Sequence, residues 1–225
     1  MSEPSADCQD LDSRVPAQGA RESHFLAILS RMRYIERWAL MRVSRPESLS
    51  EHALDVALIA HVLATLGNVR HGRTLDADRA AVIGLFHDAS EIITGDMPTP
   101  VKYHDEDIRQ AYKAVEAGAE KRLLSTLPDD LRPTYEKIFS PEAGDADPDA
   151  AADEAYLRRL VKAADKISAL IKCVDERRSG NAEFASAEAT CRAAVDEMAS
   201  ELPEVADFVT EFLPSFGATL DELLA

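Results

Sequence analysis

His87 and Asp88 follow directly after the apolar run at residues 80–86, so we expect their side chains to leave a helix inside the protein. An ionised carboxylate in that setting is costly unless it is paired or bound to a metal. Neighbouring helical positions differ by about 100°, so both side chains can approach one ion lodged between helices. The pair therefore predicts half of a metal site.

Two further polar residues lie on apolar stripes. His52 lies four residues before Val56, and Asp165 lies four residues after Val161. Two neutral imidazoles and two carboxylates would balance a divalent cation and leave positions for water or phosphate. Such nitrogen and oxygen ligands suit manganese, cobalt, iron or zinc better than calcium. Spacing alone leaves an alternative open, in which each residue is a hydrogen-bonded core residue or a cap.

Glu91 is a further acidic residue close to this pair. It stands four residues after His87, which predicts that it lies on the same side of the same helix, one turn further on. Gly84, one turn before His87, predicts a place where another backbone or a ligand comes close.

The elements that position these residues are predicted to be helices, because no run of alternating β-branched residues occurs. Ser48 stands three residues before Glu51, which predicts a capping box at the start of the second helix. The apolar run at 80–86 predicts that the third helix is the most buried, and the acidic stretch 141–153 predicts a mobile surface loop. We expect helices near 21–35, 48–67, 76–94, 105–127, 129–139, from 154 onward, and near 183–199, 203–212 and 218–224.

Composition and net charge limit the fold, the compartment and the classes of partner that we expect. With 225 residues, 46% of them hydrophobic, the chain can bury the core of one domain at 22–225, and residues 1–21 read as a disordered tail. A net charge of −16 argues against a nucleic-acid polymer. No window approaches 18 uncharged apolar residues, so we expect no membrane span. Three cysteines without a CxxC pattern indicate reduced thiols and a cytoplasmic protein.

The motif residues resemble a known family. Ser50-Glu51-His52, His87-Asp88-Ala89-Ser90-Glu91 and Asp165 match the His…His-Asp…Asp signature of the HD superfamily of metal-dependent phosphohydrolases. Three further segments resemble the bacterial HD-domain 5'-deoxynucleotidases over about residues 23–223. These segments are residues 37–42 (RWALMR), 95–103 (GDMPTPVKY) and 212–216 (FLPSF). The tail and the long acidic stretch 141–153 depart from the family pattern.

The resemblance implies an all-α, compact, multi-helix HD-domain bundle that hydrolyses deoxyribonucleoside 5'-monophosphates. Glu91 would be the general acid/base, and Arg37 would orient the phosphate. Trp38 would pack against the sugar and disfavour a ribonucleotide. One divalent metal, such as manganese or cobalt, and a homodimer are also implied. The implied metal ligands are His52, His87, Asp88 and Asp165, and the implied substrate contacts are Arg37, Trp38, His52, Asp88, Asp96, Met97, Pro98, Thr99 and Asp165.

Other interpretations of the sequence stay open. Arg37 can be a surface charge, Trp38 plain core, and Asp96 the cap of a turn. The same metal site can serve a nucleoside triphosphate or a signalling nucleotide, although a triphosphate needs more cations than Arg37, Arg42 and Lys102. A nucleotide sensor without catalysis and a metal-free structural bundle are the non-enzymatic alternatives.

Overall fold

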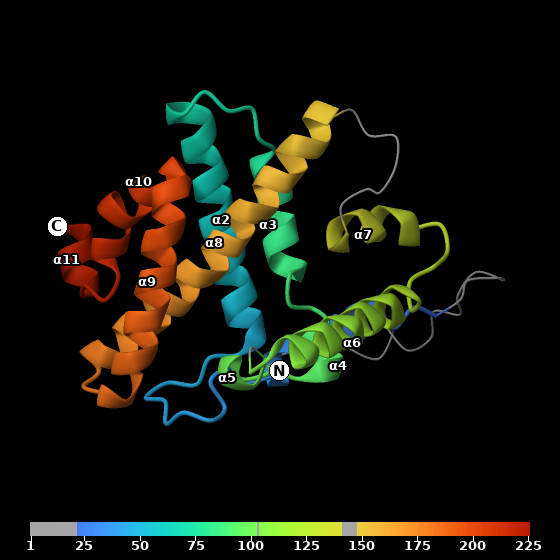
Figure 1. Ribbon diagram of the computed structural model, residues 1–225, viewed down its shortest axis with the longest axis horizontal. Helices are drawn as coiled ribbons and strands as arrows, with labels where there is room; N and C mark the ends of the chain where they lie inside the picture. Colours follow the sequence, from blue (N-terminus) through green and yellow to red (C-terminus); the bar gives the residue numbers. More distant parts are fainter. Residues whose placement is uncertain (1–21, 103, 141–147) are drawn as a thin grey trace, which may run out of the picture.

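The computed structural model describes residues 22–102, 104–140 and 148–225, and it confirms the all-α prediction (Figure 1). In these ranges the only β pairing is an isolated antiparallel bridge between Glu36 and Ser48. The α-helices are α1 Phe25–Leu29, α2 Leu49–Arg70, α3 Ala77–Phe86, α4 Glu91–Thr94, α5 Thr99–Lys102, α6 Glu106–Leu124, α7 Arg132–Phe139, α8 Pro148–Arg178, α9 Ala185–Glu201, α10 Pro203–Glu211 and α11 Leu220–Leu224. The 3-10 turns are η1 Ser30–Tyr34, η2 Ala182–Phe184 and η3 Leu213–Ser215.

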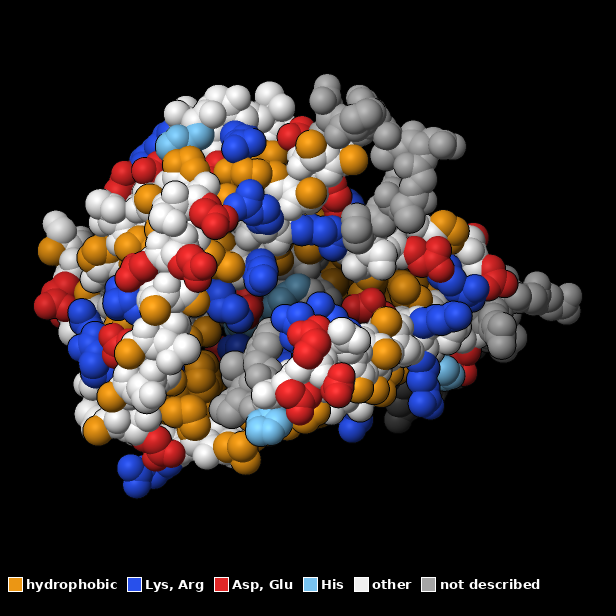
Figure 2. All heavy atoms as spheres, viewed as in Figure 1, with side chains coloured by type: hydrophobic (Ala, Val, Ile, Leu, Met, Phe, Trp, Pro, Cys, Tyr) orange, Lys and Arg blue, Asp and Glu red, His pale blue; other side chains and the backbone are white. Residues whose placement is uncertain are grey.

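Helices α2, α3 and α8 form the centre of the molecule, where each contacts the other two. Helices α9 and α10 cover one side of this group (Figure 1). Helix α6 lies beyond its other end, with α1, α4, α5 and α7 in contact with it. In the same view the surface is hollowed between α6 and α8, with a histidine side chain in the hollow (Figure 2).

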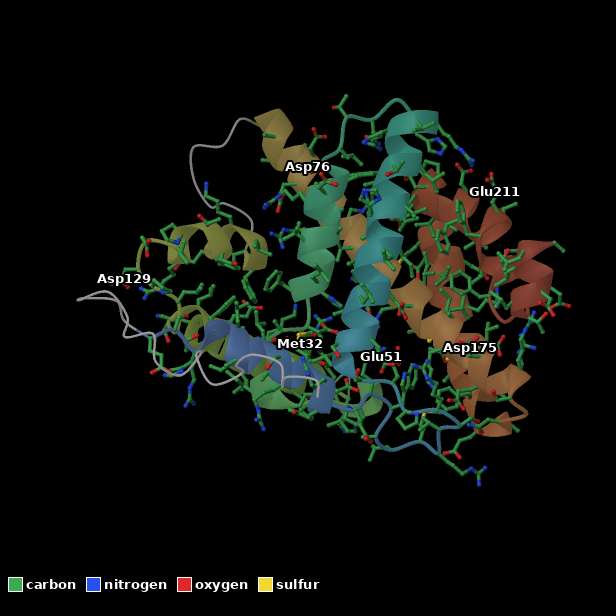
Figure 3. All side chains as sticks on the ribbon, turned by 180° about the vertical axis from the view of Figure 1, so that it is seen from behind. Met32, Glu51, Asp76, Asp129, Asp175 and Glu211 are labelled. Carbon is green, nitrogen blue, oxygen red and sulfur yellow. The ribbon has the colours of Figure 1, made fainter. Side chains whose placement is uncertain are left out.

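The helix starts follow the caps that the sequence predicts. Ser48 caps α2, its hydroxyl accepting from the Glu51 N–H at 3.3 Å while the Glu51 carboxylate accepts from the Ser48 N–H at 2.8 Å. Asp76 caps α3 by accepting from the Arg79 N–H at 2.9 Å. Glu51 and Asp76 mark opposite ends of this helical pair in Figure 3. Such caps satisfy N–H groups that the helix itself leaves free.

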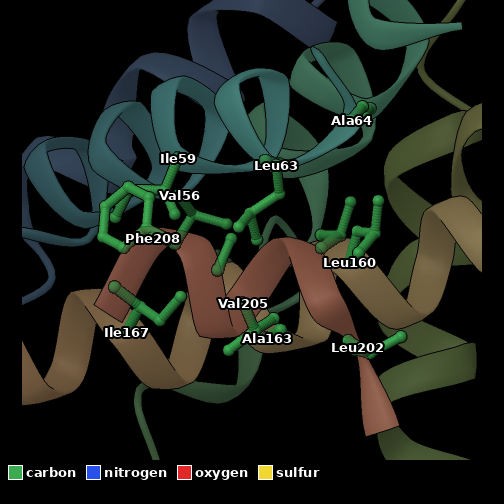
Figure 4. Close-up of a cluster of buried hydrophobic side chains, with 14 of the residues drawn as sticks. Val56, Ile59, Leu63, Ala64, Leu160, Ala163, Ile167, Leu202, Val205 and Phe208 are labelled. Carbon is green, nitrogen blue, oxygen red and sulfur yellow. The ribbon is translucent and has the colours of Figure 1, made fainter. Parts of the chain in front are cut away.

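The prediction that the third helix would be the most buried is wrong. Helix α2 takes that place, and its apolar side chains meet those of α8 and α10 in the main core (Figure 4). Helix α3 buries only Ala80, Ile83 and Gly84, while Val82 and Leu85 are 37% and 41% exposed. An apolar run shows that a helix can be covered on several sides, but its burial depends on which neighbours pack there.

Gly84 confirms the predicted close approach. A Cβ atom at this position would lie 2.8 Å from the Cα and 3.0 Å from the N of Ala57 on α2. Such distances are shorter than real Cβ contacts, and backbone rather than a flexible side chain stands in the way. The missing side chain therefore sets how closely α2 and α3 pack.

We expect Gly84→Ala to lower the free energy of unfolding by about 1–3 kcal/mol, the usual cost of overpacking a core. Gly118→Ala on exposed α6 is the matched control, because nothing lies within 4 Å of the added Cβ. That control should be stabilised by about 0.5–1 kcal/mol. Urea unfolding of both variants measures the two effects. Equal stability of the two variants would contradict the close approach.

Three boundaries differ from the prediction. Helix α8 begins at Pro148, so the acidic stretch predicted as a loop is helical in its second part. Proline suits a first helical turn, and Ala150 to Ala152 have high helix propensity. The first predicted helix divides into α1 and η1, and α2 passes Gly67 and ends at Arg70. Residues 1–21 and 141–147 lie outside the described residues, and so do the predictions for them.

Helix α2 is long and apolar enough to cross a membrane, judged by length and composition alone. However, 56% of its most apolar window is buried inside the protein, where α3, α8 and α10 contact it. The core helix of a globular protein meets the same criteria, and the fully buried His52 lies on this helix. We therefore describe α2 as a core helix.

Candidate metal centre and active site

Four side chains from the three central helices converge. His52 comes from α2, His87 and Asp88 from the turn after α3, and Asp165 from α8. His52 Nε2 lies 3.3 Å from Asp165 Oδ1 and 3.6 Å from Asp88 Oδ2. His87 Nε2 lies 3.0 Å from Asp88 Oδ2. Each of His52, His87 and Asp165 offers one ligand atom, and these three atoms lie within 4.8 Å of one another.

Contacts at the far side of each imidazole orient the two rings. His87 Nδ1 lies 2.7 Å from the Gly84 carbonyl oxygen and donates to it, because that oxygen can only accept. In a neutral ring the Nε2 lone pair is then free for a metal. His52 Nδ1 lies 3.0 Å from the Ser168 hydroxyl, which is buried with it. Ser168 stands one helical turn after Asp165, and this spacing is the signal by which the sequence could have revealed it.

The donor set fits a divalent transition metal. The Nε2 atoms of His52 and His87 are buried and have no hydrogen-bond partner among the described residues. Buried polar atoms are nearly always hydrogen-bonded, so two ring nitrogens that lie 3.0 to 3.6 Å from carboxylate oxygens without forming such a bond need an explanation. A metal ion between them would satisfy both. Two nitrogens and two carboxylates form a mixed set of the kind that manganese, cobalt, iron and zinc accept.

The electrostatics of the centre follow from burial and from the charges close to each group. Burial lowers the pKa of His52. Burial also opposes the charged form of His87, but the Asp88 carboxylate outweighs it and raises the pKa of His87 to about 9. For Asp165, contact with His52 and the charge of Lys166 outweigh burial and hold its pKa well below the usual range. Asp165 therefore stays ionised at neutral pH while His87 holds a proton.

We expect metal affinity to rise with pH up to about 9. Ligation needs a neutral ring, so below this pKa the metal must displace the proton of His87. Calorimetric titration in buffers of different ionisation enthalpy measures the proton released. A variant of an exposed histidine, His104→Gln, is the control and should keep the pH dependence. An affinity that stays constant between about pH 7 and 9 would contradict the displacement.

Glu91 is the first residue of α4, not part of a continuous helix with His87 as predicted. The break has a local cause: the His87 ring takes the Gly84 carbonyl that a continuing α-helix would offer to the Asp88 N–H. Glu91 is buried, with 6% of its surface exposed, and its Oε2 has no hydrogen-bond partner among the described residues. Burial and the carboxylates of Asp88 and Asp96 raise the pKa of Glu91 to about 8.

Arg37 and Trp38 lie beside the metal centre. The positive charge of Arg37 acts on both His52 and Glu91, lowering the pKa of each. Trp38 is half-buried and packs against Phe184 at a tilt, with 5.2 Å between ring centroids. Its φ is +62°, the left-handed region that a tryptophan rarely adopts. Such strain costs on the order of 1–3 kcal/mol and persists only where the surroundings enforce it.

Glu47 is a site residue that the sequence did not reveal. One of its oxygens, Oε2, accepts from Arg37 Nη1 at 3.1 Å and from Trp38 Nε1 at 2.8 Å. The Glu47 residue is only 9% exposed. No periodic pattern marks Glu47, because it lies in an irregular segment just before the Ser48 cap.

Of the segment after Gly95, only Asp96 has a described interaction with the site. Asp96 lies within electrostatic reach of Glu91, since its charge raises the Glu91 pKa. The Pro98 carbonyl accepts from the Lys102 N–H at 3.0 Å and directly precedes α5, a short helix at a place where the sequence predicts none. No described contact ties Met97 or Pro98 to the metal centre. The side chain of Thr99 lies outside the described part of the chain.

Lys102 is ion-paired and largely covered. Its ammonium group lies 2.8 Å from Glu116 Oε1, and only 25% of its side chain is exposed.

A cavity of about 230 Å³ reaches two of the candidate ligands, His87 and Asp165. Helices α3, α6, α7 and α8 supply its remaining wall, where the surface is hollowed in Figure 2.

Comparison with known proteins gives one consistent result. A family model described as 5'-deoxynucleotidase YfbR-like matches residues 24–216. The chain is 44% identical to a 5'-deoxynucleotidase of Vibrio cholerae over 203 residues, which cover 90% of this chain and 99% of that protein. It is 43% identical to the Escherichia coli 5'-deoxynucleotidase YfbR, covering 90% of this chain and 96% of that protein.

Solved structures show the same fold at lower identity. An HD-domain phosphohydrolase from Listeria innocua superposes with a TM-score of 0.72 at 24% identity, covering 88% of this chain and 90% of that one. An HD phosphohydrolase of cyanophage S-2L, solved with dA and one catalytic zinc ion, gives a TM-score of 0.53 at 19% identity. That comparison covers 84% of this chain and 93% of the phage protein.

Proposed function

The chain belongs to the YfbR-like 5'-deoxynucleotidase family, and from this premise we propose which of its residues carry out the reaction. The protein is a metal-dependent phosphomonoester hydrolase that converts deoxyribonucleoside 5'-monophosphates to deoxyribonucleosides and phosphate. The observation that carries the residue assignment is the pair of buried, unpartnered Nε2 atoms that face Asp88 and Asp165.

In this proposal His52, His87, Asp88 and Asp165 hold one divalent metal. A bound divalent ion supplies a water of lowered pKa and polarises the phosphate. Manganese, cobalt or another transition metal suits the ligand set, and the zinc ion of the phage phosphohydrolase belongs to the same class.

Glu91 moves the proton. Its carboxyl takes a proton from the attacking water or gives one to the leaving 5'-oxygen, and a pKa of about 8 suits either transfer near neutral pH. Burial holds the Glu91 carboxyl beside Asp88 and Asp96, where it is ready for this transfer.

Arg37, Trp38 and the segment 96–99 hold the substrate. Arg37 donates to the phosphate with the N–H groups that Glu47 leaves free. Trp38 lies against the sugar, where a rigid ring leaves no room for a 2'-hydroxyl. We assign the sugar hydroxyl to Asp96 and the nucleoside to Met97, Pro98 and Thr99. His52, Asp88 and Asp165 complete the wall around the phosphate.

The three cations that the family motif segments supply favour a monophosphate over a triphosphate. Arg37 is paired with Glu47, and Lys102 with Glu116. Arg42 is 82% exposed and lies 3.6 Å from Glu183. A triphosphate chain would need several uncommitted cations to offset its charge.

A phosphate-release screen tests the function. Deoxy- and ribonucleoside mono-, di- and triphosphates are supplied with manganese, cobalt, zinc or EDTA. Release from deoxyribonucleoside monophosphates that EDTA abolishes is the expected result. Faster release from triphosphates or ribonucleotides would overturn the proposed substrate, and nucleotide binding without release would identify a sensor.

Three properties of the whole protein are also proposed. Residues 22–225 form one phosphohydrolase domain, which the span of the family match supports. A cytoplasmic place is supported by Cys173 and Cys191, which are both free thiols. A homodimer is supported by the family resemblance and by Leu54 and Leu58, which are more than half exposed on α2. Light scattering coupled to gel filtration measures the oligomeric state.

A further inference from the structure

Glu47 joins two side chains that the proposed function assigns to different parts of the substrate. Its Oε2 accepts from the phosphate-facing Arg37 at 3.1 Å and from the sugar-facing Trp38 at 2.8 Å. We propose that Glu47 is the positioning residue that sets the orientation of both side chains, and thereby substrate affinity and the preference for deoxyribose. This inference rests on the proposed roles of Arg37 and Trp38.

The backbone around Glu47 places it in register with these partners. The Arg37 N–H donates to the Glu47 carbonyl at 3.0 Å, and the Leu49 N–H donates to the Ile35 carbonyl at 2.8 Å. Residues 35–37 and 47–49 therefore run side by side, with Glu36 and Ser48 forming the antiparallel bridge. Glu47 also directly precedes the cap of α2, the helix of His52, so the pairing fixes the Arg37–Trp38 segment against a metal ligand.

Burial strengthens the interaction of the Glu47 carboxylate with Arg37 and Trp38. The side chains of Glu47 and Arg37 are 10% and 12% exposed, so solvent screens their ion pair little. A buried carboxylate needs its charge paired and hydrogen-bonded, and Arg37 and Trp38 both donate to its Oε2. If either partner rotated away, Glu47 would lose one of these two bonds.

The strained Trp38 backbone is consistent with this anchoring. At φ +62° the residue would relax if it were free. The indole N–H bond to Glu47 and the Phe184 ring hold the side chain at its two ends, and the Met41 N–H donates to the Trp38 carbonyl at 2.8 Å. A rigid ring can discriminate between sugars only while its position is fixed.

The test uses three variants of the metal-loaded enzyme. Glu47→Gln keeps the shape of the side chain but removes its charge. Trp38→Phe keeps an aromatic ring but removes the N–H that donates to Glu47. Glu183→Gln is the matched control, because Glu183 contacts the same loop at the Arg42 N–H, 3.1 Å away, without touching Arg37 or Trp38. The value of kcat/KM is measured for one deoxyribonucleoside monophosphate and for its ribonucleoside counterpart.

We expect Glu47→Gln to lower kcat/KM for the deoxynucleotide by about 10- to 100-fold, the usual value of a hydrogen bond to a charged group. The deoxy-to-ribo ratio should fall by about fivefold or more. Trp38→Phe should lower the same ratio. In the Trp38→Phe background Glu47→Gln should lower it little further, because both changes disrupt the hydrogen bond between Trp38 and Glu47. Metal stoichiometry and the control variant should stay as in the wild type.

A wild-type ratio in Glu47→Gln, or fully additive effects in the double variant, would overturn the positioning role. These outcomes differ from a failure of the proposed function, which would appear as an inactive wild-type enzyme. A general loss of folding would lower melting temperature and metal content together, whereas loss of positioning changes the sugar preference with both retained.

Discussion

Glu91→Gln is expected to lower kcat for phosphate release by about 100- to 10,000-fold, the contribution typical of a positioned general acid–base group. Glutamine keeps the shape of the side chain but cannot carry the proton. Burial and the neighbouring acids raise the pKa of Glu91 to about 8, so the wild-type carboxyl is placed to exchange a proton near neutral pH. The four metal ligands are unchanged in the variant, and bound metal should stay at the wild-type level.

The matched control is Glu120→Gln. Glu120 is another carboxyl whose pKa is raised by burial and by Glu116, and it lines the cavity that reaches His87 and Asp165. It has no place in the proposed proton transfer, so the control should keep wild-type kcat. Single-turnover phosphate release and metal analysis of both variants separate chemistry from metal loss. Full activity of Glu91→Gln would refute the assigned role, and equal losses in the two variants would point to cavity electrostatics instead.

Local signals in the sequence predicted the parts of the fold that depend on neighbours along the chain. Ser48 with Glu51 and Asp76 cap the two helices that the pattern predicts there. Gly84 lies where two backbones meet, as a residue without a side chain suggested. These features are fixed within one or two helical turns, so spacing alone can reveal them.

The features that the sequence did not predict depend on contacts between distant segments. The sequence of α3 predicts more burial than the structure shows. The reason is that α2 rather than α3 lies between α8 and α10. The break before Glu91 depends on the ring of His87 competing for a carbonyl group. Nothing in the spacing of an apolar stripe records such competition.

The candidate site was predicted unevenly for the same reason. His52 and Asp165 lie on stripes that can be seen in the sequence, and the family motifs relate them to His87 and Asp88. Glu47 and Ser168 contact the functional side chains only in the folded protein. Glutamate and serine are common polar residues, and only tertiary structure shows that these two are buried against functional groups.

Asp88→Asn should remove the metal and the activity together. Asp88 Oδ2 lies 3.0 Å from His87 Nε2 and 3.6 Å from His52 Nε2, so this carboxylate faces both imidazole ligands. Asparagine keeps the size of the side chain but removes one of the two negative charges that would balance a dication. Changing an outer contact of a metal ligand typically costs 10- to 100-fold in affinity, about the least we expect from changing a ligand itself.

Thermal unfolding with and without metal measures this loss independently of catalysis. A ligand at about 100 times its Kd stabilises a folded protein by about 2.7 kcal/mol, so metal should raise the melting temperature of the wild type. Asp88→Asn should show almost no such shift. Asp78→Asn is the control, since the Asp78 side chain is 97% exposed and is not among the proposed ligands. If Asp88→Asn retained one metal per chain and the full thermal shift, the proposed ligand set would be wrong, because a centre that binds equally well without this charge cannot depend on it.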